Sequence, residues 1–178
     1  MRLLPPNFLA ASVALLAAAC SPTLDWRDVS PQAPTRLQSM FPCKPARQVR
    51  RITLAAVPVE MTLQVCDAAG MTFAIARADV ADPARVATAL DELATATQRN
   101  LQATAATLRR EPARVPGMTP NARAVALSFA GRNAAGRATH QSALFFANGT
   151  TVFQVTVLGE NLAADAVETF FGALRFPA

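Results

Sequence analysis

Alternating apolar and polar positions predict six or seven β-strands in this chain. The clearest alternation covers 57–66, where an apolar residue occupies every second position. Further stretches of this kind, separated by turn residues, predict strands at 47–55, 71–78, 123–130, 137–147 and 150–158. A further strand at 109–115 is expected at a sheet edge, because Pro112 has no N–H to donate within a central ladder.

Turn and capping signals connect these strands and place two helices. Asn148-Gly149 is expected to form the two-residue turn of a hairpin. Asp82-Pro83 predicts a helix start, since aspartate caps free N–H groups and proline suits the first helical position. From there to about residue 106, buried positions are expected at helical spacing: Val86, Leu90, Leu93, Thr97, Leu101 and Ala105. A second helix is expected over 162–175, with a buried face made of Ala163, Val167, Phe170 and Leu174.

The order of these elements, β-β-β-α-β-β-β-α, determines the predicted fold class. Successive strands joined by short turns pair as hairpins, so the sheet should be mostly antiparallel. The sequence therefore predicts an α+β domain with about six or seven strands and two packed helices.

Residues 1–19 have the layout of a bacterial secretory signal. A short basic start at Arg2 precedes an apolar stretch, and small residues follow as far as Ala19. The apolar stretch and its small residues, 8–19, are too short for a membrane span, which needs about 20 residues. The sequence therefore predicts an exported protein whose mature chain begins at Cys20.

Cys20 directly follows small residues, and this junction resembles the lipobox of bacterial lipoproteins. The resemblance implies a diacylglycerol on the Cys20 thiol, which would anchor the mature chain to a membrane. Ala17 stands where that family prefers leucine, so cleavage by an ordinary signal peptidase, giving a free periplasmic protein, is the alternative. In lipoproteins of Gram-negative bacteria, a residue such as Ser21 after the cysteine implies sorting to the outer membrane.

Residues 20–40 are expected to form an extended, lipidated tether, and 41–178 an α+β globular domain. Three prolines lie among polar residues within 20–40, a composition typical of linkers. Trp26, the single tryptophan, is expected to dock this tether onto the domain, although a loose aromatic near the membrane is the alternative. The mature chain is long enough for one domain with a sizeable core.

Two parts of the chain resemble the PsbP-like superfamily. They are the Phe41-Pro42 start of the domain and the closing segment Thr169-Phe170-Phe171-Gly172-Ala173-Leu174-Arg175, within the same order of hairpins and helices. The short motifs at 41–45 and 115–121 also resemble an uncharacterised group of proteobacterial envelope lipoproteins. The resemblance implies a binding or assembly module, because characterised PsbP-like proteins act mainly by docking onto larger complexes.

No recognisable catalytic set occurs in the sequence. His140, the single histidine, falls in a predicted strand on the same face as Ser142, and we expect it to be structural. No Gly-x-Ser-x-Gly elbow supplies a nucleophile. Asp91 and Glu92 are adjacent on a helix, so their side chains point about 100° apart and do not form a carboxylate pair. The sequence therefore predicts a protein that is not an enzyme.

Metal and cofactor sites are not expected either. The three cysteines are evenly spaced without a C-x-x-C pair. Asp82 lies close to Asp79, but its place before a helix explains it better as a cap than as a metal ligand.

Basic residues outnumber acidic ones, 17 to 12, and they gather in local groups. These groups are Lys44, Arg47, Arg50 and Arg51; Arg109, Arg110 and Arg114; and Arg123, Arg132 and Arg137. They could meet anionic lipid or an acidic partner, or serve only for solubility. Nucleic-acid binding is excluded by the predicted export.

Cys43 and Cys66 are expected to form a disulfide. With Cys20 acylated, they are the two thiols that remain in an oxidising compartment. A tight turn near Ala56 would place the strands on either side of it next to each other, so that Cys66 lies opposite residue 46 or 47 and Cys43 comes within reach. Two buried free thiols are the alternative.

These features together predict a non-enzymatic outer-membrane lipoprotein that faces the periplasm and acts as a partner-binding or assembly module. The alternative is an envelope hydrolase or small-ligand carrier with an unrecognised site. Converging polar groups in a pocket would favour that alternative, whereas a solid core with an exposed apolar patch would favour docking.

Overall fold

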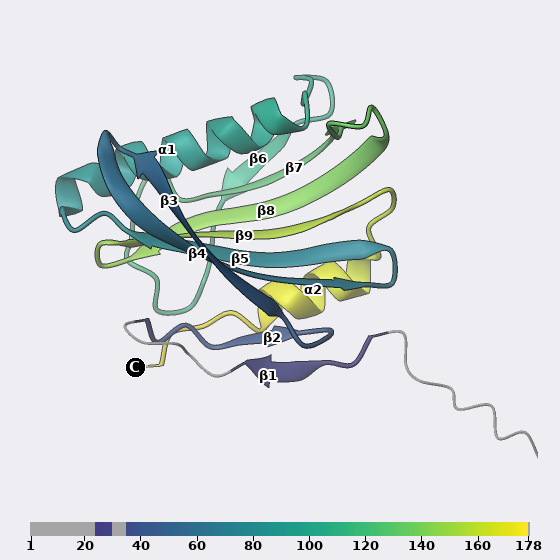
Figure 1. The fold of residues 1–178 in the computed structure, drawn as a ribbon, viewed down its shortest axis with the longest axis horizontal. Helices are drawn as coiled ribbons and strands as arrows, with labels where there is room; N and C mark the ends of the chain where they lie inside the picture. Colours follow the sequence, from purple (N-terminus) through teal and green to yellow (C-terminus); the bar gives the residue numbers. More distant parts are fainter. Residues whose placement is uncertain (1–23, 30–34, 178) are drawn as a thin grey trace, which may run out of the picture.

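A seven-stranded antiparallel sheet forms the centre of the computed structural model, which describes residues 24–29 and 35–177 (Figure 1). The elements are β1 Arg27–Val29, β2 Ser39–Phe41, β3 Ala46–Leu54, β4 Val57–Ala68, β5 Met71–Asp79, α1 Pro83–Asn100, β6 Arg109–Pro112, β7 Val125–Arg132, β8 Ala138–Asn148, β9 Thr151–Gly159 and α2 Ala164–Gly172. The expected α+β class and antiparallel sheet are confirmed.

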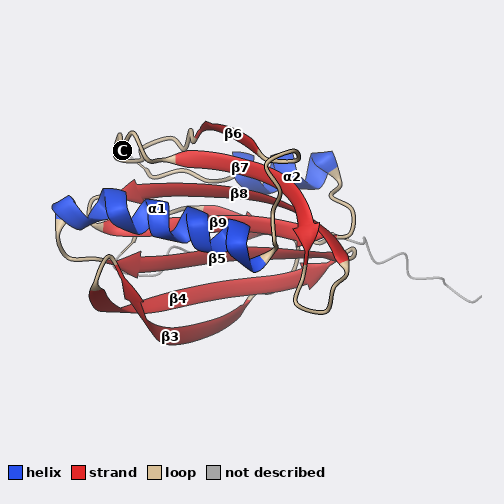
Figure 2. Cartoon of the chain, turned by 90° about the horizontal axis from the view of Figure 1, so that it is seen from above, coloured by secondary structure: helices blue, strands red, loops and turns tan. Residues whose placement is uncertain are grey.

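The strands follow the order β3-β4-β5-β9-β8-β7-β6 across the sheet. Two runs of hairpins, β3-β4-β5 and β7-β8-β9, meet where β5 pairs with β9. The helix α1 connects the two runs along the chain. Figure 2 shows the consequence, with β3 at one edge of the sheet and β6 at the other.

One face of the sheet is covered by α1, which contacts β8 and β9. The Asp82 side chain accepts a hydrogen bond from the Ala84 N–H (2.9 Å) at the start of this helix, as its sequence predicts. Leu90 of α1 is buried in the same core as Phe145 of β8. The helix ends at Asn100 and not near 106, because the Leu101 carbonyl accepts a hydrogen bond from the Arg132 N–H (2.7 Å) instead of extending the helix.

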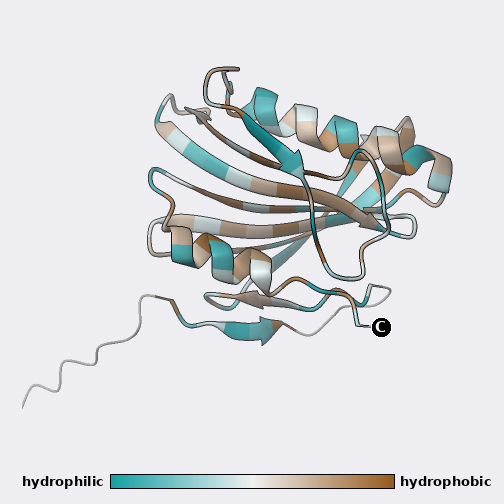
Figure 3. Cartoon of the chain, turned by 180° about the vertical axis from the view of Figure 1, so that it is seen from behind, coloured by the Kyte–Doolittle hydropathy of each residue, from teal (hydrophilic) through white to brown (hydrophobic). Residues whose placement is uncertain are grey.

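The opposite face carries a second core under α2, β1 and β2. Phe41, Phe73 and Phe170 are all fully buried there, and their rings meet edge to face. The helix α2 is shorter than the expected 162–175 helix, and Ala166 takes the buried position that was expected of Ala163. Hydrophobic residues run along the middle strands of the sheet, and hydrophilic residues alternate with them along both helices (Figure 3).

The β8–β9 turn lies one residue further along the chain than its sequence indicates. Asn148 pairs with Thr151, so the two turn residues are Gly149 and Thr150, with Gly149 at φ 59°. The Asn148 side chain instead donates a hydrogen bond to the Gly117 carbonyl (2.9 Å). The expectation of an Asn148-Gly149 turn is therefore wrong, because asparagine serves to hold a neighbouring loop.

Part of the segment expected to be a tether packs on the domain. Strand β1 pairs with β2, and Trp26 meets Phe73 edge to face with ring centroids 6.0 Å apart. Residues 24–29 and 35–40 therefore belong to the folded unit. The predicted signal at 1–19 and Cys20 lie outside the described residues.

Candidate interaction surface

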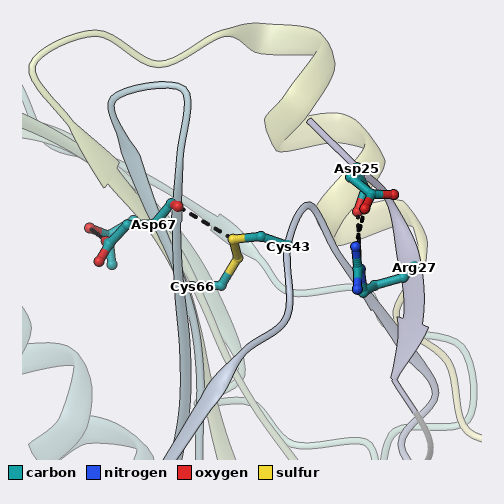
Figure 4. Close-up of a disulfide and its surroundings, with 6 residues drawn as sticks. Asp25, Arg27, Cys43, Cys66 and Asp67 are labelled. Carbon is teal, nitrogen blue, oxygen red and sulfur yellow. Dashed lines mark hydrogen bonds and ion pairs between the residues drawn. A yellow bond between two sulfur atoms is a disulfide. The ribbon is translucent and has the colours of Figure 1, made fainter. Parts of the chain in front are cut away.

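Cys43 and Cys66 form a disulfide, with their Cα atoms 6.0 Å apart (Figure 4). The register that pairs Ala46 with Val65 extends to place Cys66 opposite residue 45, slightly earlier than expected. The cause is the position of the turn, whose two residues are 55 and 56. The predicted bridge is thus present in the structure.

The disulfide ties the N-terminal segment to the central sheet. Cys66 pairs across β4 and β5 with Phe73, the residue that Trp26 contacts. Arg27 forms an ion pair with Asp25 on the same segment (Figure 4). One covalent bond and one aromatic contact therefore act on neighbouring positions to hold this segment in place.

His140 lies near the start of β8 in a shallow hollow of about 470 Å³ that also includes Ser128 and Ser142. Its Nδ1 is 2.8 Å from the Glu160 carbonyl, which can only accept, so Nδ1 carries the proton and donates. No carboxylate side chain lines this hollow in the described part of the chain. The histidine thus links β8 to the loop after β9 and lacks the acid of a catalytic triad.

The carboxylates weighed as catalytic or metal-binding candidates each make a structural bond. Asp79 accepts from the Ala81 N–H (2.8 Å), and Asp91 pairs with Arg123 at 3.3 Å. Glu92 does not face Asp91 but accepts from the backbone of the β3–β4 turn. Within 24–29 and 35–177, no group of three or more potential metal-ligating side chains comes together. None of the helices described is both long and apolar enough to cross a membrane.

A second polar hollow lies at the same end of β9 as the His140 hollow. It has a volume of about 470 Å³ and is lined by the β4–β5 turn, the β7–β8 turn and the residues after β9. Arg137 and Glu160 are its charged members. Its hydroxyl groups are held by neighbouring acceptors: Thr72 donates to the Asp67 carboxylate (2.5 Å), and Thr139 donates to the Arg137 carbonyl (3.2 Å).

Strand β3 presents the most distinctive exposed surface. It pairs only with β4 in the described part of the chain, and residues 46–51 are all exposed. Val49, at the middle of the strand, is 48% exposed, and no other large apolar side chain among the described residues is exposed. We call the unpaired side of 46–54 the β3 edge.

Arginines surround Val49 on the β3 edge. Because strand side chains alternate, Arg47 and Arg51 share the face of Val49, and Arg50 lies on the other face. Arg51 lies 3.6 Å from Glu60, but both side chains are mostly exposed, so the ion pair is weak. The strand itself carries no acidic residue, which leaves the β3 edge cationic.

A further cation lies behind the edge, on the same face of the sheet as Val49. Arg77 of β5 donates to the Thr35 hydroxyl at 3.3 Å. Burial, and then the nearby Arg47 guanidinium, lower the pKa of Arg77. A hollow of about 220 Å³ contains both arginines together with Glu60 and Asp79.

An apolar groove of about 500 Å³ runs between β3 and α1. Ile52 and Leu54 of β3 and Leu93 of α1 line it, and Arg99 lies at the end of the helix. Two acidic groups also line it, but Asp91 is paired with Arg123 and Glu92 with the turn backbone. The groove therefore adds an apolar surface next to the end of β3, on the face opposite Val49.

Sequence reasoning found the arginines of this surface but not its position. It grouped Lys44, Arg47, Arg50 and Arg51 by proximity, whereas the structure divides them between two faces. The available signal was the loss of alternation over 46–51, since a strand that is polar on both faces is typical of a sheet edge. The groove depends on a contact between β3 and α1 that no local pattern encodes.

Comparison of the chain with protein-family models and with curated proteins gives no match.

Proposed function

We propose that this chain is a non-enzymatic lipoprotein of the outer membrane, facing the periplasm, which binds a protein partner through the β3 edge. The observation that carries the proposal is the joint exposure of Val49 and three arginines on an edge strand, whose outer side has no partner strand among the described residues. Val49 on one face of β3 and the apolar groove on the other face both offer area for burial, and the cations offer selectivity.

Features outside the β3 edge support the location and the absence of catalysis. A disulfide persists in an oxidising compartment such as the periplasm, and the sequence of 1–20 resembles a lipoprotein signal. His140, Asp79, Asp91 and Glu92 each make a structural bond. The likeness to PsbP-like proteins, which act by docking, agrees with a binding role and stays part of the proposal.

The first prediction concerns the lipid anchor. Replacing Cys20 with Ala removes the acylated thiol, so the protein should move from the membrane fraction to the soluble periplasmic fraction. Fractionation of cells followed by immunoblotting measures this, with Ser21→Ala as a control that keeps the thiol. A variant that stays with the membrane, together with an unmodified mass for the N-terminal peptide of the wild type, would show that the protein is not a lipoprotein.

Partner binding is tested separately in intact cells. A photo-crosslinking amino acid at position 49 should give a crosslinked species of defined mass, and the same group at exposed position 168 on α2 should not. If neither position crosslinks to a protein under any growth condition, the partner-binding function is wrong.

A further inference from the structure

The backbone of the β3 edge offers an ordered row of hydrogen-bonding groups. Leu54 and Val57 flank a two-residue turn and so form a hydrogen-bonded pair with each other. Hydrogen-bonded pairs alternate along an antiparallel ladder. The residues between them, Arg47, Val49, Arg51 and Thr53, therefore direct their N–H and C=O groups away from β4 and outward.

A second strand can add to such an edge. In β-strand addition, the main chain of an extended segment bonds to the exposed strand, and side-chain pockets provide specificity. The β3 edge has nine residues, and nothing in the described ranges pairs with its outer side.

The charges along β3 indicate which segment would fit. An added strand would place side chains opposite Arg47, Arg50 and Arg51, and acidic residues at those positions would gain opposite-charge cross-strand pairs. Near Ile52 and Leu54 the neighbouring groove is apolar. The complementary segment is therefore acidic at one end and apolar at the other.

A second copy of this chain does not fit the same edge. Antiparallel pairing of two β3 strands would bring arginines from both copies close together. Like charges directly opposite each other destabilise a strand pair. Arginine at an edge thus disfavours self-association while favouring an acidic partner.

Building on the proposed function, we infer that the partner is a protein with an extended acidic segment, which adds to β3 as an antiparallel eighth strand of the main sheet. In this orientation the apolar residues of the segment come first and lie beside the α1 groove. The acidic residues follow and lie opposite the arginines.

A synthetic peptide tests the chemistry directly. The fluorescent probe Val-Thr-Ile-Glu-Glu-Val-Thr-Glu-Thr matches this order, and a second probe has lysine in place of each glutamate. The purified full-length lipoprotein in detergent should bind the glutamate probe, more weakly as salt rises, and should not bind the lysine probe. Equal binding of the two probes, or no binding of the glutamate probe, overturns the inference.

Two variants test the position and mode of binding. Val49→Pro removes an outward N–H without breaking the β3–β4 ladder, and should weaken probe binding about tenfold. Val49→Thr keeps that N–H and should bind within a few-fold of the wild type. Unchanged binding by Val49→Pro overturns strand addition.

Charge reversal provides a variant whose folding is not in question, because both side chains are exposed. The Arg47→Glu/Arg51→Glu protein should no longer bind the glutamate probe and should bind the lysine probe instead. If it keeps its preference for the glutamate probe, the β3 edge is not the binding surface. Crosslinking in cells from exposed position 51 of the Val49→Pro variant separates the two proposals. A partner still captured there binds the β3 edge without adding a strand, which leaves the proposed function intact and removes only strand addition.

Discussion

At the scale of single residues, Gly131 shows how a contact with a residue distant in sequence can exclude any side chain. It lies near the end of β7, where the backbone of that strand meets the end of α1. A Cβ atom at this position would collide with the Leu101 carbonyl oxygen, the same oxygen that accepts the Arg132 N–H. The absence of a side chain is therefore what permits the end of α1 to dock on β7.

Gly131→Ala should lower the free energy of unfolding by about 3 kcal/mol, because backbone atoms on both sides must shift. Urea unfolding measures the change. Gly172→Ala is the matched control, since a Cβ there meets no atom within 4 Å, and its stability should stay within about 1 kcal/mol of the wild type. Equal stability of the two variants would contradict the claim that the close contact with Leu101 requires glycine at position 131.

Gly131 follows the strand predicted at 123–130 and precedes the strand predicted at 137–147, where sequence alone makes it a turn residue. A glycine needed for close approach looks the same in sequence as a glycine needed for a turn. The distance between Cys43 and Cys66 could be predicted more easily, because the pairing of two neighbouring strands in one hairpin is enough to determine it.

At the scale of elements, α1 holds the β3–β4 turn in shape. Ala55 and Ala56 both have positive φ, 49° and 62°, although the turn favours asparagine and glycine. The Glu92 carboxylate accepts from the Ala55 N–H (2.8 Å), and Arg85 donates to the Ala55 carbonyl (3.1 Å). Two side chains of one helix thus stabilise an unfavourable backbone conformation in a hairpin.

Glu92→Ala should destabilise the protein by about 1–3 kcal/mol, because the buried Ala55 N–H loses its acceptor. Hydrogen exchange at the Ala55 amide should also accelerate, which identifies the turn as the site of the change. Asp91→Ala is the control: its ion pair with Arg123 is half exposed and should contribute at most about 1 kcal/mol. Unchanged exchange at Ala55 in the Glu92 variant would rule out this role.

Most strands could be predicted to within one or two residues, because alternation and turn residues are local signals. The C-terminal ends of both helices could not, although Asp82-Pro83 did predict the start of α1. The end of α1 depends on the contact between Leu101 and Arg132. The order of strands is also non-local. For that reason the arginines at 47–51 were recognised as a group, while their place at a sheet edge beside α1 was not.

At the scale of the whole molecule, the disulfide joins the N-terminal segment to the sheet. Replacing the pair with Cys43→Ser and Cys66→Ala should lower the free energy of unfolding by about 3 kcal/mol on the chain-entropy model. The Trp26 ring should become more accessible to acrylamide, because Phe73 pairs with position 66. Fluorescence quenching before and after reduction of the wild type measures this with a single tryptophan.

Reductant added to the double variant is the control, and it should not change the acrylamide quenching of Trp26. Peptide mapping without reduction examines the bridge itself in protein taken from the periplasm. Alkylation of both cysteines under those conditions would show that no bridge forms in the cell.

The same bridge has a mechanical consequence for an anchored protein that holds a partner. Tension between the membrane and the partner would first peel β1 from β2, which only a short ladder joins. Unravelling would stop at Cys43, because the bond to Cys66 closes a covalent loop that contains all of β3. Force on the N-terminal end could therefore not pull β3 out as a linear chain without breaking that bond, and the strand proposed to bind the partner would stay attached after β1 and β2 had yielded.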